Sequence, residues 1–169
     1  LKERAETGRI YIMNLDHCNS HSSFKDKVSM SNLCQEITLP TTPIQHPDDE
    51  QGEIALCILS AVNVGALNDL SELENICDLS VRALEQIIDY QDYPVKAAEV
   101  STKKRRSLGI GYIGLAHYLA KNGVKYSDPK AWELVDRLSE AFQYHLLRAS
   151  CDIAMEKGKC EGFERTKYA

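Results

Sequence analysis

The sequence contains no apolar stretch that approaches the roughly 20 residues needed to cross a membrane. Residues 1–4 are mostly charged and lead into no apolar run, so no secretory signal peptide is visible. No internal repeat is found, which argues against a repeat architecture. The net charge of −5 over 169 residues gives no general attraction to nucleic acid. These absences favour a globular protein of the cytoplasm, and the chain is long enough for one domain with a hydrophobic core.

The cysteines form no C-x-x-C pair and have no histidines beside them at zinc-type spacing, so no metal site is predicted. A disulfide-stapled secreted fold would be shorter and richer in cysteine. Free thiols in a reducing compartment are therefore expected, and each is more typical of a small buried side chain than of a catalyst. The six are Cys18, Cys34, Cys57, Cys77, Cys151 and Cys160.

The first 30 residues have the character of strand and loop. Residues 9–13 form a short β-prone run, residues 20–30 are typical of a loop, and Pro40 closes a mixed segment at 31–39. Residues 52–64 contain an almost continuous apolar run. That run predicts a strand buried on both faces, as in a parallel sheet covered by helices.

Residues 71–158 are predicted to be mainly helical. The predicted helices run from Ser71 to about Asp92, from Tyr112 to Asn122, and from Asp128 to Gly158. The first begins with a capping-box pattern at Ser71 and Glu74, and Cys77 lies on its apolar stripe, so we expect Cys77 in the core. The stripe of the last helix is predicted to contain Trp132, Val135, Phe142, Leu146, Ala149 and Ile153. Strands alternating with helices indicate an α/β fold with its functional loops at the carboxyl ends of the strands.

Two further patterns leave alternatives open. The basic run at 103–106 predicts a solvated loop, with a phosphate contact as the alternative. Residues 109–114 match G-x-G-x-x-G, yet a dinucleotide site needs an acidic residue at the end of a second strand, and Asp128 instead begins a helix. Close packing of a helix on a strand is the favoured explanation of these glycines. A non-catalytic α/β nucleotide-binding module remains the alternative function.

The segment Ser31–Ile37 contains the candidate catalytic residues. In an extended stretch Asn32, Cys34 and Glu36 would point to the same side, about 6–7 Å apart. Such a row offers a hydrogen-bond donor, a redox-active sulfur and a general base to one small substrate. The structural alternative is a strand edge with a partly exposed cysteine.

Residues 32–36 resemble the Asn-x-Cys-x-Glu finger loop of ribonucleotide reductase large subunits, most closely the aerobic, di-iron-partnered class of bacteria and phages. The resemblance extends over nearly the whole chain, in order. Its other segments are Thr7–Ile12, Asp16–Asn19, Gly52–Cys57, Tyr90–Pro94 and Leu108–Gly111. The implied fold is part of a ten-stranded α/β barrel, with residues 1–169 as a single partial catalytic-barrel domain and 31–39 as its finger loop.

The resemblance implies radical reduction of ribonucleoside diphosphates to deoxyribonucleotides for DNA synthesis. Cys34 would be the thiyl radical that removes the 3′-hydrogen, and Glu36 the base that takes the 3′-hydroxyl proton. Asn32 would bind the ribose hydroxyls and orient Glu36, and residues 32–36, including Leu33 and Gln35, would contact the substrate. Cys57 would be one of two thiols that end as a disulfide.

The resemblance also implies what lies outside the chain. No cofactor is expected within it, because a di-iron-tyrosyl small subunit would supply the radical and ATP or dATP would act as allosteric effectors on the full subunit. Thioredoxin or glutaredoxin would be the reductant. The second redox cysteine is expected elsewhere in the large subunit and is not Cys18. Both ends look like cuts through a longer protein, so we expect the chain alone to be inactive and to need its missing parts.

Overall fold

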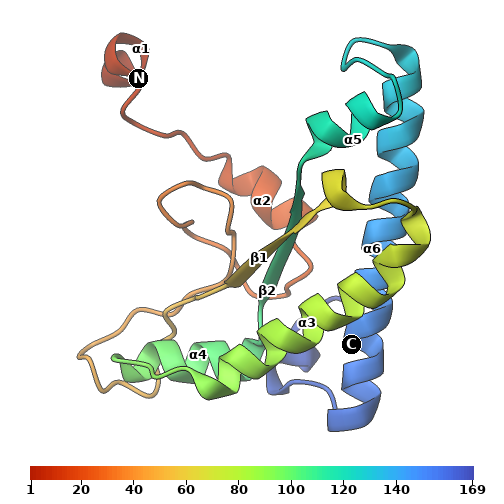
Figure 1. Cartoon of the computed structure of the whole chain (residues 1–169). Helices are drawn as coiled ribbons and strands as arrows, with labels where there is room; N and C mark the ends of the chain where they lie inside the picture. The colour runs from red at the N-terminus through yellow and green to blue at the C-terminus, as the bar shows by residue number, and fades with distance from the viewer. The chain divides into compact units, whose positions relative to one another are not determined.

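Figure 1 shows the computed structural model, which describes residues 1–169 throughout. The chain divides into two compact units. The first, here called the loop unit, consists of Leu1–Leu56, Tyr93–Arg105 and Glu161–Ala169. The second, the sheet unit, consists of Cys57–Asp92 and Arg106–Cys160. None of the helices is long and apolar enough to cross a membrane.

The sheet unit is built on two parallel strands, β1 (Ile58–Asn63) and β2 (Leu108–Ile113), which pair in register from Ile58 with Leu108 to Asn63 with Ile113. The predicted parallel pairing is confirmed. The predicted burial of the first strand on both faces is wrong, because Leu59 is 57% exposed while Val62 is 7% exposed. Strand β1 is also shorter than the predicted 52–64, because Glu53 instead forms an antiparallel bridge with Thr42.

Two long helices cover the sheet, α3 (Leu73–Tyr90) and α6 (Pro129–Lys157) (Figure 1). Their contact faces and β1 form one hydrophobic cluster, whose buried members include Val62, Leu73, Cys77, Leu138 and Phe142. The prediction that Cys77 lies in the core is confirmed, since its side chain is fully buried. Burial of such side chains is the main stabilising contribution in this unit.

The helix ends differ from prediction in detail. The capping box before α3 is formed by Asp69 and Glu72 in the 3₁₀ turn η2 (Leu70–Glu72), not by Ser71 and Glu74. Helix α6 begins with Pro129 and ends before Gly158, as predicted, but Trp132 is 72% exposed and does not belong to the buried stripe. The remaining elements of the unit are the 3₁₀ turn η1 (Val64–Ala66) and helix α5 (Leu115–Lys121).

The loop unit contains three helices and a 3₁₀ turn. These are α1 (Lys2–Thr7), α2 (Leu15–His21), α4 (Lys96–Arg105) and η3 (Glu161–Arg165). The strand predicted at 9–13 is not formed, and its Ile10, Tyr11 and Ile12 are about half exposed (46%, 57% and 55%). The basic residues 103–105 end helix α4 rather than forming a loop. A strand cannot be stable without a partner, so β-prone residues alone do not produce one.

Candidate active site

The segment with Cys34 folds as a tight turn and not as an extended strand. The backbone N–H of Gln35 donates to the carbonyl of Asn32 at 3.2 Å, and Gln35 has a positive φ of 63°. Leu33 and Cys34 are the two central residues of this turn, and both are exposed. The turn therefore presents the Cys34 thiol at the tip of the loop.

The side chain of Asn32 closes the turn. Its Oδ1 accepts a hydrogen bond from the backbone N–H of Ile37 at 3.0 Å, and its Nδ2 donates to Oε1 of Glu36 at 2.5 Å. Asparagine commonly stabilises turns by bonding to nearby backbone groups in this way. The predicted alternation over 31–37 is therefore wrong, because the Asn32 amide competes successfully with an extended backbone. The Asn32 and Glu36 side chains are joined by this direct bond, and the predicted orienting role of Asn32 stays a prediction.

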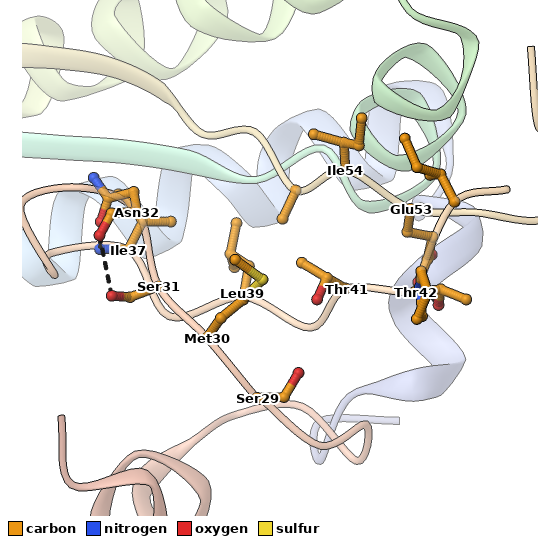
Figure 2. Close-up of a pocket in the computed structure, with 13 residues that line it drawn as sticks. Ser29, Met30, Ser31, Asn32, Ile37, Leu39, Thr41, Thr42, Glu53 and Ile54 are labelled. Atoms are coloured by element: carbon orange, nitrogen blue, oxygen red, sulfur yellow. Dashed lines mark hydrogen bonds between the residues drawn. The ribbon is translucent and has the colours of Figure 1, made fainter. Parts of the chain in front are cut away.

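An apolar pocket of about 570 Å³ lies at the base of this loop (Figure 2). Asn32 and Ile37 lie at one end of it, and Thr42 and Glu53 lie at the other. Met30, Leu39, Ile44 and Ile54 supply apolar walls. Cys34 and Glu36 do not line the pocket.

Cys57 belongs to the sheet unit, whereas Asn32, Cys34 and Glu36 belong to the loop unit. Its side chain is half-buried, and the residue directly precedes β1. Cys57 therefore lies at the amino end of that strand, and the prediction that it lies within the strand is wrong. Its Sγ lies 4.0 Å from the carbonyl oxygen of Ile58. A Cβ on Gly109, in the paired strand, would lie only 3.0 Å from this sulfur. A glycine at 109 therefore makes room for Cys57.

The glycine run has a packing role that differs from the predicted one. Gly109 and Gly111 lie inside β2, and a Cβ on Gly109 would also lie 2.5 Å from Cδ2 of Leu59 in β1. Gly114 has a φ of 79° and precedes α5, and a Cβ there would meet Oδ1 of Asn63 at 2.3 Å. Gly109 and Gly114 thus allow close contact with β1 and its end, whereas a Cβ on Gly111 would meet nothing within 4 Å. They do not form the phosphate-binding turn of a dinucleotide site, which would have to follow the strand.

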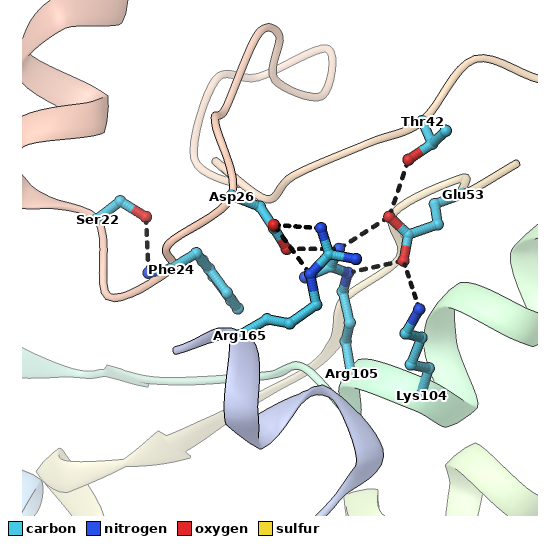
Figure 3. Close-up of polar contacts among 8 residues, drawn as sticks. All are labelled: Ser22, Phe24, Asp26, Thr42, Glu53, Lys104, Arg105 and Arg165. Atoms are coloured by element: carbon cyan, nitrogen blue, oxygen red, sulfur yellow. Dashed lines mark hydrogen bonds and ion pairs between the residues drawn. The ribbon is translucent and has the colours of Figure 1, made fainter. Parts of the chain in front are cut away.

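A buried charge cluster in the loop unit was missed by sequence reasoning (Figure 3). Arg105 donates two hydrogen bonds to Glu53, from Nε to Oε1 at 3.2 Å and from Nη2 to Oε2 at 2.8 Å. The same Nη2 also donates to Oδ2 of Asp26 at 3.1 Å, and Nε of Arg165 donates to Oδ1 of Asp26 at 2.9 Å. Lys104 lies beside Glu53 at 3.8 Å. Both predicted readings of the 103–106 run are wrong for Arg105, which binds protein carboxylates.

The cluster keeps its carboxylates ionised. Burial by itself would raise the pKa of Glu53, but hydrogen bonds and charge attraction from Arg105 outweigh it and hold the pKa below its ordinary value. Burial and the neighbouring Arg165 and Arg105 act on Asp26 in the same way, and its pKa is also lowered.

In the sheet unit, Arg106 pairs with Glu85 and Asp89 at 2.7 and 2.8 Å. No local pattern could have predicted these pairs, because the partners lie far apart in the sequence.

These features define a class of protein: an α/β protein that exposes a thiol on a tight turn, next to a carboxylate held by an amide. No group of three or more metal-ligating side chains is found. The family model described as "Ribonucleotide reductase, barrel domain" matches residues 1–169. The chain belongs to this family, and its two parallel strands and their helices are part of an incomplete α/β barrel.

The curated relatives carry the same assignment. The chain is 59% identical to the "Ribonucleoside-diphosphate reductase subunit alpha" of Haemophilus influenzae, over 100% of this chain and 23% of the relative. It is 57% identical to the protein of that name from Buchnera aphidicola subsp. Schizaphis graminum, over 99% of this chain and 22% of the relative. The corresponding protein of Enterobacteria phage T4 is 39% identical, over 100% and 22%. The chain thus spans less than a quarter of the length of these relatives.

Proposed function

We propose that this chain supplies the radical-bearing cysteine loop of a ribonucleoside-diphosphate reductase large subunit. Cys34 is the thiyl radical, Glu36 the base, and Asn32 the amide that holds Glu36 and contacts the ribose hydroxyls. The backbone and side chains of Leu33 and Gln35 complete the substrate contact. The observation that carries the proposal is the exposed thiol of Cys34 on a turn closed by the Asn32–Glu36 hydrogen bond.

The geometry suits a radical reduction. The Cys34 sulfur takes the 3′-hydrogen atom, so an S–H bond forms, a C–H bond breaks and the unpaired electron moves to the sugar carbon. Glu36 accepts the proton of the 3′-hydroxyl, and the hydrogen bond from Asn32 fixes the orientation of its carboxylate. The 2′-hydroxyl leaves as water with a proton from one thiol of a reducing pair, and the other thiol gives a hydrogen atom to C2′. The pair closes to a disulfide by passing one electron to C3′, and Glu36 returns its proton to the 3′-oxygen. Returning the hydrogen atom from Cys34 restores the sulfur radical for the next turnover.

The two electrons for the reduction come from a pair of thiols, which become a disulfide. Cys57 is one of the pair, and its position beside Gly109 leaves its sulfur in a half-buried site. The second thiol lies in another part of the large subunit. Thioredoxin or glutaredoxin then reduces the disulfide, a radical-generating small subunit with a di-iron-tyrosyl centre supplies the radical, and ATP or dATP regulates the full subunit. The proposed location is the cytoplasm, where thiols stay reduced.

The test uses the complete reductase that contains this chain, with its small subunit and a reductant. We expect Cys34→Ser to abolish formation of deoxyribonucleoside diphosphate, because a hydroxyl cannot replace the sulfur radical. Cys57→Ser should stop repeated turnover. Cys151→Ser, which changes an exposed cysteine on α6, is the matched control and should retain full activity. Product formation by the Cys34→Ser enzyme would refute the proposal.

A further inference from the structure

Arg105 joins the two ends of the segment that carries Cys34. Asp26 precedes the 31–39 loop, and Thr42 follows it. Arg105 binds Asp26 directly at 3.1 Å and reaches Thr42 through Glu53, whose Oε2 accepts a hydrogen bond from Thr42 Oγ1 at 3.1 Å. Both sides of the loop are therefore fixed to one guanidinium at the end of α4 (Figure 3).

The backbone reinforces this closure on each side. Thr42 and Glu53 exchange two backbone hydrogen bonds, of 3.2 and 3.0 Å. Phe24 forms an antiparallel bridge with Thr166, and its ring lies 5.8 Å from the Arg105 guanidinium carbon. A cation over an aromatic ring gains a further attraction. The segment between these two anchors contains the whole finger loop.

The cluster depends on the shape of arginine. The Arg105 side chain is only 3% exposed, and its carboxylate partners Glu53 and Asp26 are 8% and 17% exposed. A planar guanidinium can bind one carboxylate with two parallel bonds while still donating to another, and a lysine amine cannot reproduce this fork. A lysine at 105 would keep the positive charge but would hold at most one end of the loop firmly.

We infer that Arg105 is a positioning residue for Cys34, because it fixes both ends of the turn that presents the thiol. The inference rests on the proposed role of Cys34. Reactions that need a near-attack geometry lose about a hundredfold in rate when a reacting group is misplaced by about 1 Å. Loosening the base of the loop therefore slows hydrogen transfer to the Cys34 sulfur.

The experiment compares Arg105→Lys with Arg82→Lys in the complete reductase. Arg82 is the matched control, because it also bridges two carboxylates, Asp78 at 3.0 Å and Glu156 at 2.7 Å, but lies in the sheet unit. We expect kcat to fall about tenfold or more in Arg105→Lys and to stay unchanged in Arg82→Lys. With a 3′-deuterated substrate, the isotope effect on kcat should rise in Arg105→Lys, because hydrogen transfer has become the slow step.

Hydrogen exchange gives a second measurement that is independent of turnover. The Ile37 amide is held by Asn32, so its exchange should be faster in Arg105→Lys, while amides of α6 exchange as in the wild type. Wild-type kcat and Ile37 exchange in Arg105→Lys would overturn the inference. A lower kcat with an unchanged isotope effect would also overturn it, since that pattern means fewer active molecules.

A second variant tests the inference if Arg105→Lys does not fold. Asp26→Asn removes the negative charge before the loop and one of the two oxygens that accept from Arg105 and Arg165, and it leaves the bonds between Arg105 and Glu53 intact. Its control is Glu99→Gln, which removes another carboxylate bound to two cations, Lys96 at 3.1 Å and Lys103 at 2.8 Å. Ile37 exchange should be faster in Asp26→Asn than in Glu99→Gln, and equal exchange would overturn the inference. Cys34→Ser is measured in parallel: turnover by that variant refutes the proposed function, whereas full activity of Arg105→Lys refutes only the positioning role.

Discussion

Replacing Gly109 with alanine should displace Cys57, whereas the same change at Gly111 should not. Both glycines lie in β2, and neither has a positive φ, so alanine fits the backbone at each position. A Cβ on Gly109 would lie 2.5 Å from Leu59 Cδ2 and 3.0 Å from Cys57 Sγ, whereas a Cβ on Gly111 would meet nothing within 4 Å. The two substitutions are therefore a matched pair that differs only in what the new methyl group contacts.

The magnitude follows from these contacts. Forcing an extra methyl group into a packed site costs about 1–3 kcal/mol. Leu59 is 57% exposed and can rotate away at a cost near the lower end of about 0.5–1.5 kcal/mol, but the Cys57 sulfur is half-buried and must shift. Both variants gain the same stabilisation, about 0.4–1 kcal/mol, from the restricted unfolded chain, and this gain cancels in the comparison. We expect Gly109→Ala to be less stable than Gly111→Ala by about 1–2 kcal/mol.

Native-state hydrogen exchange in the complete subunit provides the assay, because it reports local opening of β1 and β2 in a protein too large for simple two-state unfolding. The amides of these strands should open more readily in Gly109→Ala than in Gly111→Ala. Turnover should also fall more in Gly109→Ala, since the change moves Cys57. Equal opening free energies, or a larger loss at Gly111, would refute the packing role assigned to Gly109.

Two other outcomes are expected. Because the pKa values of Asp26 and Glu53 are lowered in the folded state, the unfolded chain binds protons more readily. Their stabilisation is therefore complete only above the ordinary carboxyl pKa values of 3.8 and 4.5, and it is lost as the pH falls through the lowered pKa values. Urea titrations between pH 6 and pH 3 should show that the free energy of unfolding falls with pH, and that it falls less steeply in Glu53→Gln. A free energy of unfolding that stays constant or rises as the pH falls would contradict the prediction. Burial raises the pKa of the Cys77 thiol to about 11, so iodoacetamide at about pH 8 should label exposed Cys151 and spare Cys77 until the protein unfolds. Mass spectrometry that found both cysteines labelled at equal rates would contradict the assigned burial.

The parts of the fold that depend on local patterns were predictable from the sequence. Helix α6 follows from Pro129 at its first turn, Gly158 at its end and a buried stripe that includes Phe142. The burial of Cys77 follows from helical spacing in α3. The parallel pairing of β1 and β2 follows from apolar segments separated by helices. The first two signals are each contained within one element, and the third depends only on the order of elements along the chain.

The parts that depend on distant partners were not predictable. The β-prone residues 9–13 form no strand, while the basic run contains Arg105, whose partners Asp26 and Glu53 lie 79 and 52 residues away. The residues of the candidate site were identified by resemblance, yet their arrangement was not. Period-two alternation cannot reveal that the Asn32 side chain bonds to the Ile37 amide and turns the chain.

The register of the two strands has a consequence for synthesis on the ribosome. Ile58 pairs with Leu108, so β1 leaves the ribosome about fifty residues before the strand that will bond to it. At about 5–20 residues per second, its N–H and C=O groups wait several seconds for that partner. During this delay α3, which follows β1 after the 3₁₀ turns η1 and η2 and packs on it in the folded chain, can shelter the apolar face of Val62. The order of elements therefore makes the helix that packs on β1 available before the strand that pairs with β1.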